Sequence, residues 1–143
     1  TVIQSKKKRR TQQSKKIGLA GERHVYNYEY DKLLKENRKD LAEKITKHFE
    51  NYEYPGWDIT SYDKTGNEIF IEVKSTKGNT INQLEITSNE WDAAKKEGEK
   101  YFIYLVNNAL NEKIKVFEKI NNPAKLVDDN SIDISTSVYE LKL

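Results

Sequence analysis

The sequence contains no cysteine and no methionine, and it has only two histidines among its 143 residues. Without cysteine it cannot form disulfides, thiolate zinc sites or a cysteine nucleophile, and only His24 and His48 can offer imidazole ligands to a metal. A structural zinc cluster is therefore excluded. The absence of methionine means that the natural start codon is not represented, so we expect this chain to be part of a longer protein.

Long hydrophobic runs are also missing. No segment approaches the ~20 apolar residues that a membrane-spanning helix needs, and no segment near the N-terminus is typical of a secretory signal. We therefore expect a cytoplasmic protein that does not interact with a membrane. A chain of 143 residues that is 36% hydrophobic suits one compact domain, which buries roughly two-thirds of the surface of the unfolded chain.

Acidic residues are absent from the first 16 positions. These hold seven Lys or Arg, which leaves 18 of the 25 basic residues against all 23 acidic ones in 17–143. The net charge of +2 thus combines a basic arm with an acidic body. A flexible arm that carries Lys6, Lys7, Lys8, Arg9 and Arg10 would add salt-dependent affinity for nucleic-acid phosphates. The alternative is that residues 1–16 are a solvated linker or a fusion boundary.

The hydrophobic patterning predicts an α/β (α+β) domain over residues 17–143, with a central mixed β-sheet flanked by helices. Helices are expected over about 16–37, capped by Ser14, over 38–49, and from the capping-box sequence Thr87-Ser88-Asn89-Glu90 to Gly98. Strands are expected over 57–62, 68–74 and 101–106. Residues 83–86 and 114–117 are further short strand candidates, the second paired with 101–106.

A five-residue turn, 63–67, separates the first two predicted strands and has the length of a hairpin connection. If the hairpin is centred on Thr65, opposed residue numbers sum to 130 and Asp58 faces Glu72. Lys74 lies two positions beyond Glu72, and therefore on the same face. The other face is apolar and is predicted to be core; it comprises Trp57, Ile59, Ile69, Ile71 and Val73.

Two carboxylates that oppose each other on a sheet destabilise it unless they share a proton, a cation or a metal ion. Mg²⁺ prefers carboxylate and carbonyl oxygens, and usually takes one or two protein carboxylates. Asp58 and Glu72 are therefore candidate ligands of Mg²⁺, or of Mn²⁺ in its place, with the main-chain carbonyl of Val73 as a third. Lys74 would hold the metal-bound water near its reactive pKa or stabilise charge on a phosphate. The pattern predicts metal-assisted hydrolysis of a phosphodiester.

A Glu-x-Lys tripeptide alone is unspecific, since Glu140-Leu141-Lys142 repeats it near the C-terminus. The specific signal is the combination of a turn with Pro and Gly before Asp58, a tight hairpin, and Ile-Glu-Val-Lys on an otherwise apolar strand. The alternative is an exposed hairpin face on which Glu72 and Lys74 form an ion pair worth at most ~1 kcal/mol.

Pro55-Gly56-Trp57-Asp58 followed by Glu72-Val73-Lys74 resembles the PD-(D/E)XK pattern of restriction-endonuclease-like nucleases, with Trp57 directly before the first acid. Several segments together resemble the C-terminal domain family of the plant protein NO VEIN, which is found also in bacterial helicase-like and restriction or defence proteins. These segments are GLAGE (18–22), GWDITSYD (56–63), IEVKST (71–76), LEITSNEW (84–91) and YFIYLV (101–106). The resemblance extends from about Ile17 to Val106.

The resemblance implies a restriction-endonuclease-like fold and a Mg²⁺-dependent DNA endonuclease domain, the cleavage module of a restriction or anti-phage defence protein. It adds Glu22 on the first helix to the catalytic residues, and Gln83 as a residue that contacts a phosphate or positions a water. Glu29 lies seven residues after Glu22, on the same helical face, and both acids could instead point to water. Glu90 is explained by capping and is not assigned to the site.

DNA is the expected partner, with other domains or subunits of a defence system and a second copy of the chain as further ones. Because the body is acidic, a DNA-binding groove must come from local basic patches that include Lys74 and Lys77, or from another domain. Ser75 could donate to phosphate oxygens or simply end the strand. Two other functions stay open: a nucleic-acid-binding module with this fold but without turnover, and a protein-interaction domain whose acidic hairpin face is solvated.

Overall fold

The computed structural model of the chain describes residues 12–48, 50–51, 53–113, 117–136 and 141–143. Its elements are α1 (Gln12–Lys35), α2 (Lys39–Ala42), β1 (Thr46–Lys47), β2 (Ile59–Tyr62), β3 (Glu68–Ser75), α3 (Ser88–Glu97), the 3-10 helix η2 (Gly98–Lys100), β4 (Tyr101–Val106), β5 (Glu118–Asn121) and α4 (Pro123–Asp128). The strands form one mixed sheet in the order β1-β2-β3-β4-β5, with β3 and β4 parallel. The predicted mixed α/β class is confirmed.

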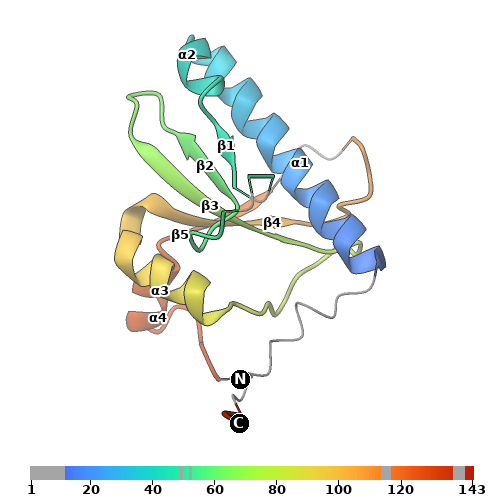
Figure 1. Ribbon diagram of the computed structural model, residues 1–143, viewed down its shortest axis with the longest axis vertical. Coiled ribbons are helices and arrows are strands. Elements are labelled where there is room, and N and C mark those ends of the chain that lie inside the picture. The colour runs from blue at the N-terminus through green and yellow to red at the C-terminus, as the bar shows by residue number, and fades with distance from the viewer. Residues whose placement is uncertain (1–11, 49, 52, 114–116, 137–140) are drawn as a thin grey trace.

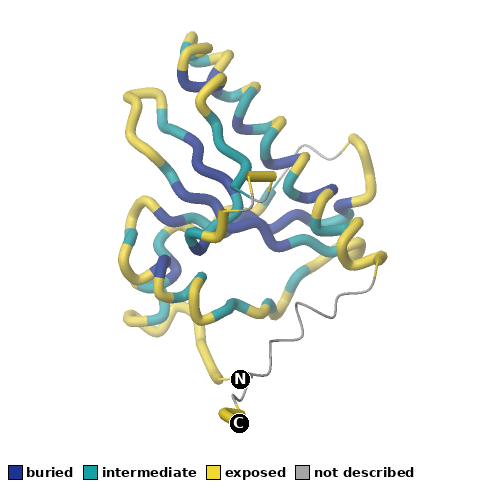
Figure 2. The backbone as a smooth tube through the Cα atoms, in the orientation of Figure 1, coloured by how far each residue is buried: buried dark blue, intermediate teal, exposed yellow. Residues whose placement is uncertain are grey.

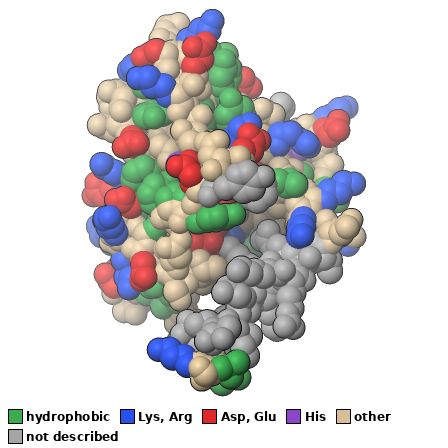
Figure 3. Space-filling view, viewed as in Figure 1, with side chains coloured by type: hydrophobic (Ala, Val, Ile, Leu, Met, Phe, Trp, Pro, Cys, Tyr) green, Lys and Arg blue, Asp and Glu red, His purple; other side chains and the backbone are tan. Residues whose placement is uncertain are grey.

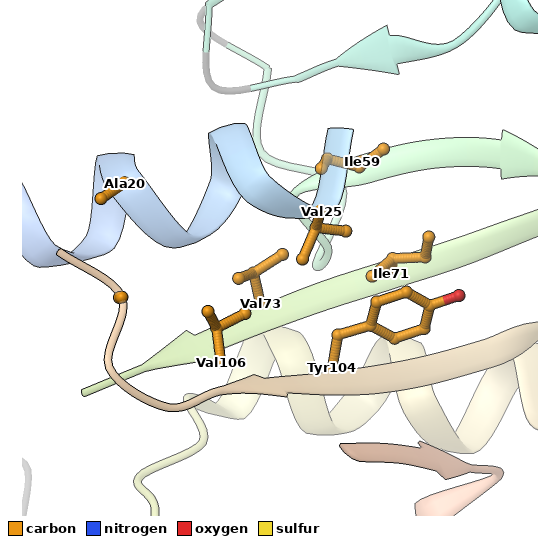
Figure 4. Packing of buried hydrophobic residues seen from close by; sticks show 8 residues of the cluster. Ala20, Val25, Ile59, Ile71, Val73, Tyr104 and Val106 are labelled. Carbon is orange, nitrogen blue, oxygen red and sulfur yellow. The ribbon is translucent and has the colours of Figure 1, made fainter. Parts of the chain in front are cut away.

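Helices cover both faces of the sheet (Figure 1). On one face α1 packs on a cluster that includes Val25, Ile71, Val73 and Val106 (Figure 4). On the other face α3 packs on a second cluster built around Phe70, Tyr101, Ile103 and Leu105. Burial is accordingly highest along the central strands (Figure 2). Because successive side chains of a strand point to opposite faces, Glu72 and Lys74 share the α3 side with Phe70.

The hairpin register agrees with the prediction. Thr60 pairs with Phe70 and Tyr62 with Glu68, so opposed numbers do sum to 130. The turn is stabilised locally, because the Asp63 carboxylate accepts hydrogen bonds from the amides of Thr65 and Asn67. Such a side-chain-to-backbone turn fixes the register of the strands that it joins.

The helical elements differ from the prediction near the N-terminus. Helix α1 begins at Gln12, so residues 12–16 of the predicted arm are helical and Ser14 is not the N-cap; residues 1–11 lie outside the described part. The second helix ends at Ala42, and Thr46 pairs with Thr60 as the edge strand β1. The spacing of Leu41 and Ile45 fits a helix. The helix does not continue, because Thr46 and Lys47 form backbone hydrogen bonds with the edge of β2 instead.

Three further expectations are corrected. Residues 83–86 form no strand, and Leu84 and Ile86 pack against the α3-side cluster without pairing. Among the described residues the strand antiparallel to β4 is β5 (Glu118–Asn121); of the predicted strand 114–117, residues 114–116 lie outside the described part and Phe117 is not in a strand. Trp57 lies on the α3 side, stacked on Phe70 with ring centroids 4.2 Å apart, and not on the face of Ile59.

Candidate functional site

Asp58 lies immediately before β2 and is held against β3 by the backbone. Its amide donates to the carbonyl of Ile71 (2.9 Å), and its carboxylate Oδ2 accepts the amide of Val73 (2.8 Å). The strand ladder ends at Ile59 and Ile71, so Asp58 and Glu72 are not a ladder pair. The prediction that they oppose each other directly is therefore wrong, but their carboxyl groups are close enough to interact through a side-chain hydrogen bond.

Glu72 and Lys74 come from β3 and are both buried, with 3% and 9% of their surface exposed. The Lys74 Nζ lies 3.1 Å from Oε2 of Glu72 and 2.9 Å from Oε1 of Glu90, so one ammonium bridges two carboxylates. The alternative of an exposed hairpin face is therefore wrong. Burial of these charges is unfavourable unless each is paired, and the bridging lysine provides that pairing.

Glu90 is a member of the cluster that was not predicted from the sequence. It is the third residue of α3, and its Oε1 accepts the amide of Thr87 (3.1 Å) while its own amide donates to the Thr87 hydroxyl (3.2 Å). This is the predicted capping box. The same Oε1 also accepts from Lys74, so the cap and the site share one atom. The LEITSNEW segment indicated the capping role of Glu90. Its contact with Lys74 could not be predicted from the sequence, because it depends on how α3 packs on β3.

The turn before Asp58 is docked on the start of α3. Gly56 has φ of +109°, and a Cβ at this position would lie 2.5 Å from Cβ of Ala93 and 2.9 Å from the carbonyl oxygen of Asn89. A residue with a side chain would not fit there. The Tyr101 hydroxyl of β4 donates to the Gly56 carbonyl (2.8 Å) and so ties the turn to the sheet.

The electrostatics of the cluster favour protons or cations. Burial raises the pKa of the Asp58 carboxyl above its ordinary value, against the lowering effects of the Val73 amide, the Glu72 hydrogen bond and the Lys74 charge. Burial also raises the pKa of Tyr101, assisted by the negative charges of Glu72, Glu90 and Asp58, so its hydroxyl stays a donor.

A cavity of about 90 Å³ opens beside the carboxylates, which is room for several water molecules. Its lining residues are Glu53, Tyr54, Gly56, Trp57, Asp58, Glu72, Asn89 and Glu90. Carboxylate oxygens at a cavity with room for water fit the donor set that Mg²⁺ prefers. Within the described residues, no group of three or more His, Cys, Asp or Glu side chains is arranged to hold a metal ion. The chain would therefore supply two carboxylates and the Val73 carbonyl, and water the rest.

Other predicted site residues lie elsewhere. Gln83 is exposed in the segment between β3 and α3. Ser75 faces α1, and its hydroxyl is buried without a hydrogen-bond partner among the described residues, so the expectation that it donates to phosphates is wrong. Its position is odd-numbered along β3, which turns it away from Lys74. Lys77 is exposed just beyond β3, and Lys6 to Arg10 lie outside the described residues.

The two acids of α1 have different surroundings. Glu22 is half-buried and directly follows Gly21, which lies against Ser75 at the end of β3. Glu29 is fully buried; its carboxylate accepts from the hydroxyls of Ser61 and Tyr104, both at 2.8 Å. The alternative that Glu29 points to water is therefore wrong, and its role is to join α1 to β2 and β4. A catalytic role for Glu22 stays a prediction.

The fold and the cluster together define a mixed α/β protein with a buried carboxylate pair and a lysine where two neighbouring strands meet a helix. A family model described as "Protein NO VEIN, C-terminal" matches residues 21–119, more than half of the chain. The chain belongs to this family, as its motifs indicated. No curated protein and no solved structure matches it. Within the described residues, every helix is too short or too polar to cross a membrane.

Proposed function

We propose that this chain is a Mg²⁺-dependent nuclease domain of the PD-(D/E)XK type, with a restriction-endonuclease-like fold, that hydrolyses phosphodiester bonds in DNA. The observation that carries the proposal is the convergence of Asp58, just before β2, with Glu72 and Lys74 of β3: Asp58 and Glu72 line one cavity, and the Lys74 ammonium lies 3.1 Å from the Glu72 carboxylate. As a module of a larger cytoplasmic restriction or defence protein, it would leave sequence recognition to other domains.

Each residue of the cluster has a definite part in the proposed reaction. A bound Mg²⁺ or Mn²⁺ would lower the pKa of a water and polarise the phosphate. Asp58 and Glu72 would supply the oxygens that hold the ion, both in their ionised forms. Lys74 keeps a positive charge beside the cavity, where it stabilises negative charge developing on the phosphate oxygens. Glu90 positions that ammonium at 2.9 Å.

One observation favours a second candidate, a nucleic-acid-binding module without turnover. The Lys74 ammonium already pairs with both Glu72 and Glu90, so these two carboxylates have a cationic partner without a metal ion. A protein-interaction domain with a solvated acidic face is no longer supported, because Glu72 is buried under α3. The two remaining candidates differ in whether Mg²⁺ binds the cluster and starts cleavage.

Cleavage of supercoiled plasmid in Mg²⁺ or in EDTA tests the proposal. We expect nicked or linear product only with Mg²⁺, and a loss of roughly 10² to 10³ in rate for Asp58→Ala and for Lys74→Ala. Glu68→Ala is the matched control, because Glu68 is an exposed acid on the same strand and should keep the wild-type rate. Cleavage that persists in EDTA, or that survives Asp58→Ala, contradicts the proposed site.

A measurement that does not depend on turnover separates the two candidates. Isothermal titration with Mn²⁺ should detect binding to the wild-type chain and to Glu68→Ala, but not to Asp58→Ala. DNA binding without Mn²⁺ binding and without cleavage would favour the module that lacks turnover.

A further inference from the structure

A second concave surface lies at the start of α1. It is a groove of about 620 Å³ between the first half of α1 and the loop that follows β4. Its lining residues are Gln12, Lys15, Lys16, Leu19, Ala20, Arg23, Leu110 and Glu112, none of which lines the cavity of the candidate site. The helical positions are spaced so that most of them share one face of α1.

The groove is positively charged, and the described residues do not neutralise its cations. Lys15, Lys16 and Arg23 face one carboxylate, Glu112. Across the described ranges no ion pair involves any of the three. Lys and Arg side chains are also frequent on this flank of the molecule, at the right of Figure 3. Like charges on one helix face repel each other, so an anionic partner would be stabilising here.

The shape of the groove is set by contacts between its two walls. The imidazole Nε2 of His24 hydrogen-bonds the carbonyl of Ala109 (2.9 Å) and ties the loop to α1. Leu19 and Leu110 line the groove with 49% and 40% of their surface exposed. The groove thus combines basic side chains with partly exposed apolar ones. This combination suits a polymer whose negative charges are regularly spaced and are joined by less polar groups.

The groove also lies close to the strand that carries the candidate site. Gly21 of α1 lies against Ser75, the last residue of β3, which is three residues or roughly 10 Å from Glu72. The segment after β3 runs beside the groove loop, since the amide of Asn108 donates to the Gly78 carbonyl (2.8 Å) and that of Ala109 to the Thr76 carbonyl (2.9 Å). This segment brings Lys77 to the same end of the sheet.

We propose that this groove binds the sugar-phosphate backbone of the DNA strand that extends from the candidate site. The identity of the occupant rests on the proposed function. Glu72 points to the α3 side of the sheet and the groove lies on the α1 side, so a strand that is cut at Asp58 and Glu72 reaches the groove by passing the end of β3, where Ser75 lies against Gly21. Lys15, Lys16 and Arg23 contact its phosphates and hold the strand without reading its sequence.

Fluorescence anisotropy of a labelled DNA duplex, measured in EDTA over a salt series, tests this groove. The triple variant Lys15→Glu, Lys16→Glu, Arg23→Glu should bind at least about tenfold more weakly, with a salt slope smaller by about 2 to 3 because three phosphates are no longer neutralised. The matched control reverses the charges of Lys35, Lys44 and Lys64, which are exposed and lie outside the groove. Equal affinities for the two triple variants would overturn the proposal.

A second measurement uses the wild-type chain and needs no variant. Bound DNA should protect Lys15 and Lys16 from acetylation at least about threefold more than Lys35 and Lys44, as read by mass spectrometry. Equal protection of the four lysines overturns the groove, and so does preferential displacement of the DNA by poly-glutamate, which would point to an acidic protein partner. A chain that binds DNA through the groove but does not cleave it refutes the proposed nuclease and leaves the groove intact.

Discussion

At the scale of single residues, the Asp58 carboxyl links the stability of the protein to pH and to cations. Its raised pKa means that the folded chain favours the protonated form more than the unfolded chain does. As pH rises above the ordinary value of 3.8, ionisation of this buried group therefore reduces stability, until pH passes the raised pKa. A divalent cation that binds the ionised form reverses that loss.

We therefore predict that Asp58→Asn stabilises the protein in EDTA at about pH 8. The amide removes the buried charge, its oxygen can still accept the Val73 amide, and its NH₂ can donate to Glu72. The melting temperature should rise by roughly 2 to 4 °C for each kcal/mol recovered, and the difference from wild type should shrink as pH falls toward about 4. Mg²⁺ should raise the melting temperature of the wild type and leave that of Asp58→Asn unchanged.

Asp63 provides a control of opposite sign. The side-chain hydrogen bond from Thr65, with further bonds from Asn67, lowers the pKa of Asp63 to about 2. A lowered pKa gives stability that is present above the ordinary value and lost as pH falls toward about 2, so Asp63→Asn should destabilise the protein at pH 8. The linkage would be contradicted if both variants moved in the same direction.

At the scale of elements, the contact between α1 and β3 depends on one position without a side chain. A Cβ on Gly21 would lie 1.7 Å from Oγ and 2.8 Å from Cβ of Ser75. The helix therefore lies directly on the end of β3, which places both Glu22 and the basic groove beside the strand of the candidate site. The two glycines of the GLAGE segment are the sequence signal for this close approach.

We predict that Gly21→Ala destabilises the protein by at least about 1 to 3 kcal/mol, the usual range for overpacking. Ser75→Gly removes both clashing atoms, so the double variant should recover most of the loss in a chemical denaturation cycle. Ser75→Gly alone has the cost of a strand glycine and serves as the reference. A loss in Gly21→Ala that the second substitution does not reduce would place the clash elsewhere.

Features that depend on local contacts could be predicted from the sequence. The hairpin register follows from a turn in which Asp63 binds amides two and four residues later, and the capping box of α3 lies within four consecutive residues. The position of Trp57 depends on where α3 packs, and so do the burial of Glu72 and the second contact of Glu90. The second helix begins where it was predicted but ends early for a similar reason, since Thr46 and Lys47 of its predicted last turns pair with β2 instead.

At the scale of the whole molecule, positive charge is concentrated near the start of the chain. Lys6 to Arg10 carry five of the 25 basic residues, and three further cations line the groove at the start of α1. The remainder of the chain is acidic in balance. Because counterion release depends on the number of phosphates contacted, affinity for DNA should depend on these two clusters more than on net charge.

We predict that replacing Lys6, Lys7, Lys8, Arg9 and Arg10 with Gln weakens DNA binding in EDTA and lowers the salt slope by up to about 4.5, or about 0.9 for each phosphate that is no longer neutralised. The substitutions change the net charge from +2 to −3, because 20 basic residues then face 23 acidic ones. A control with Gln at the exposed Lys35, Lys39, Lys44, Lys64 and Lys95 changes the net charge equally. If both sets lower the slope by the same amount, the long-range field of the protein governs binding and residues 6–10 have no special part. A slope that falls only in the first set shows that these residues contact phosphates directly, and the groove at α1 then continues a path of cations that begins before Gln12.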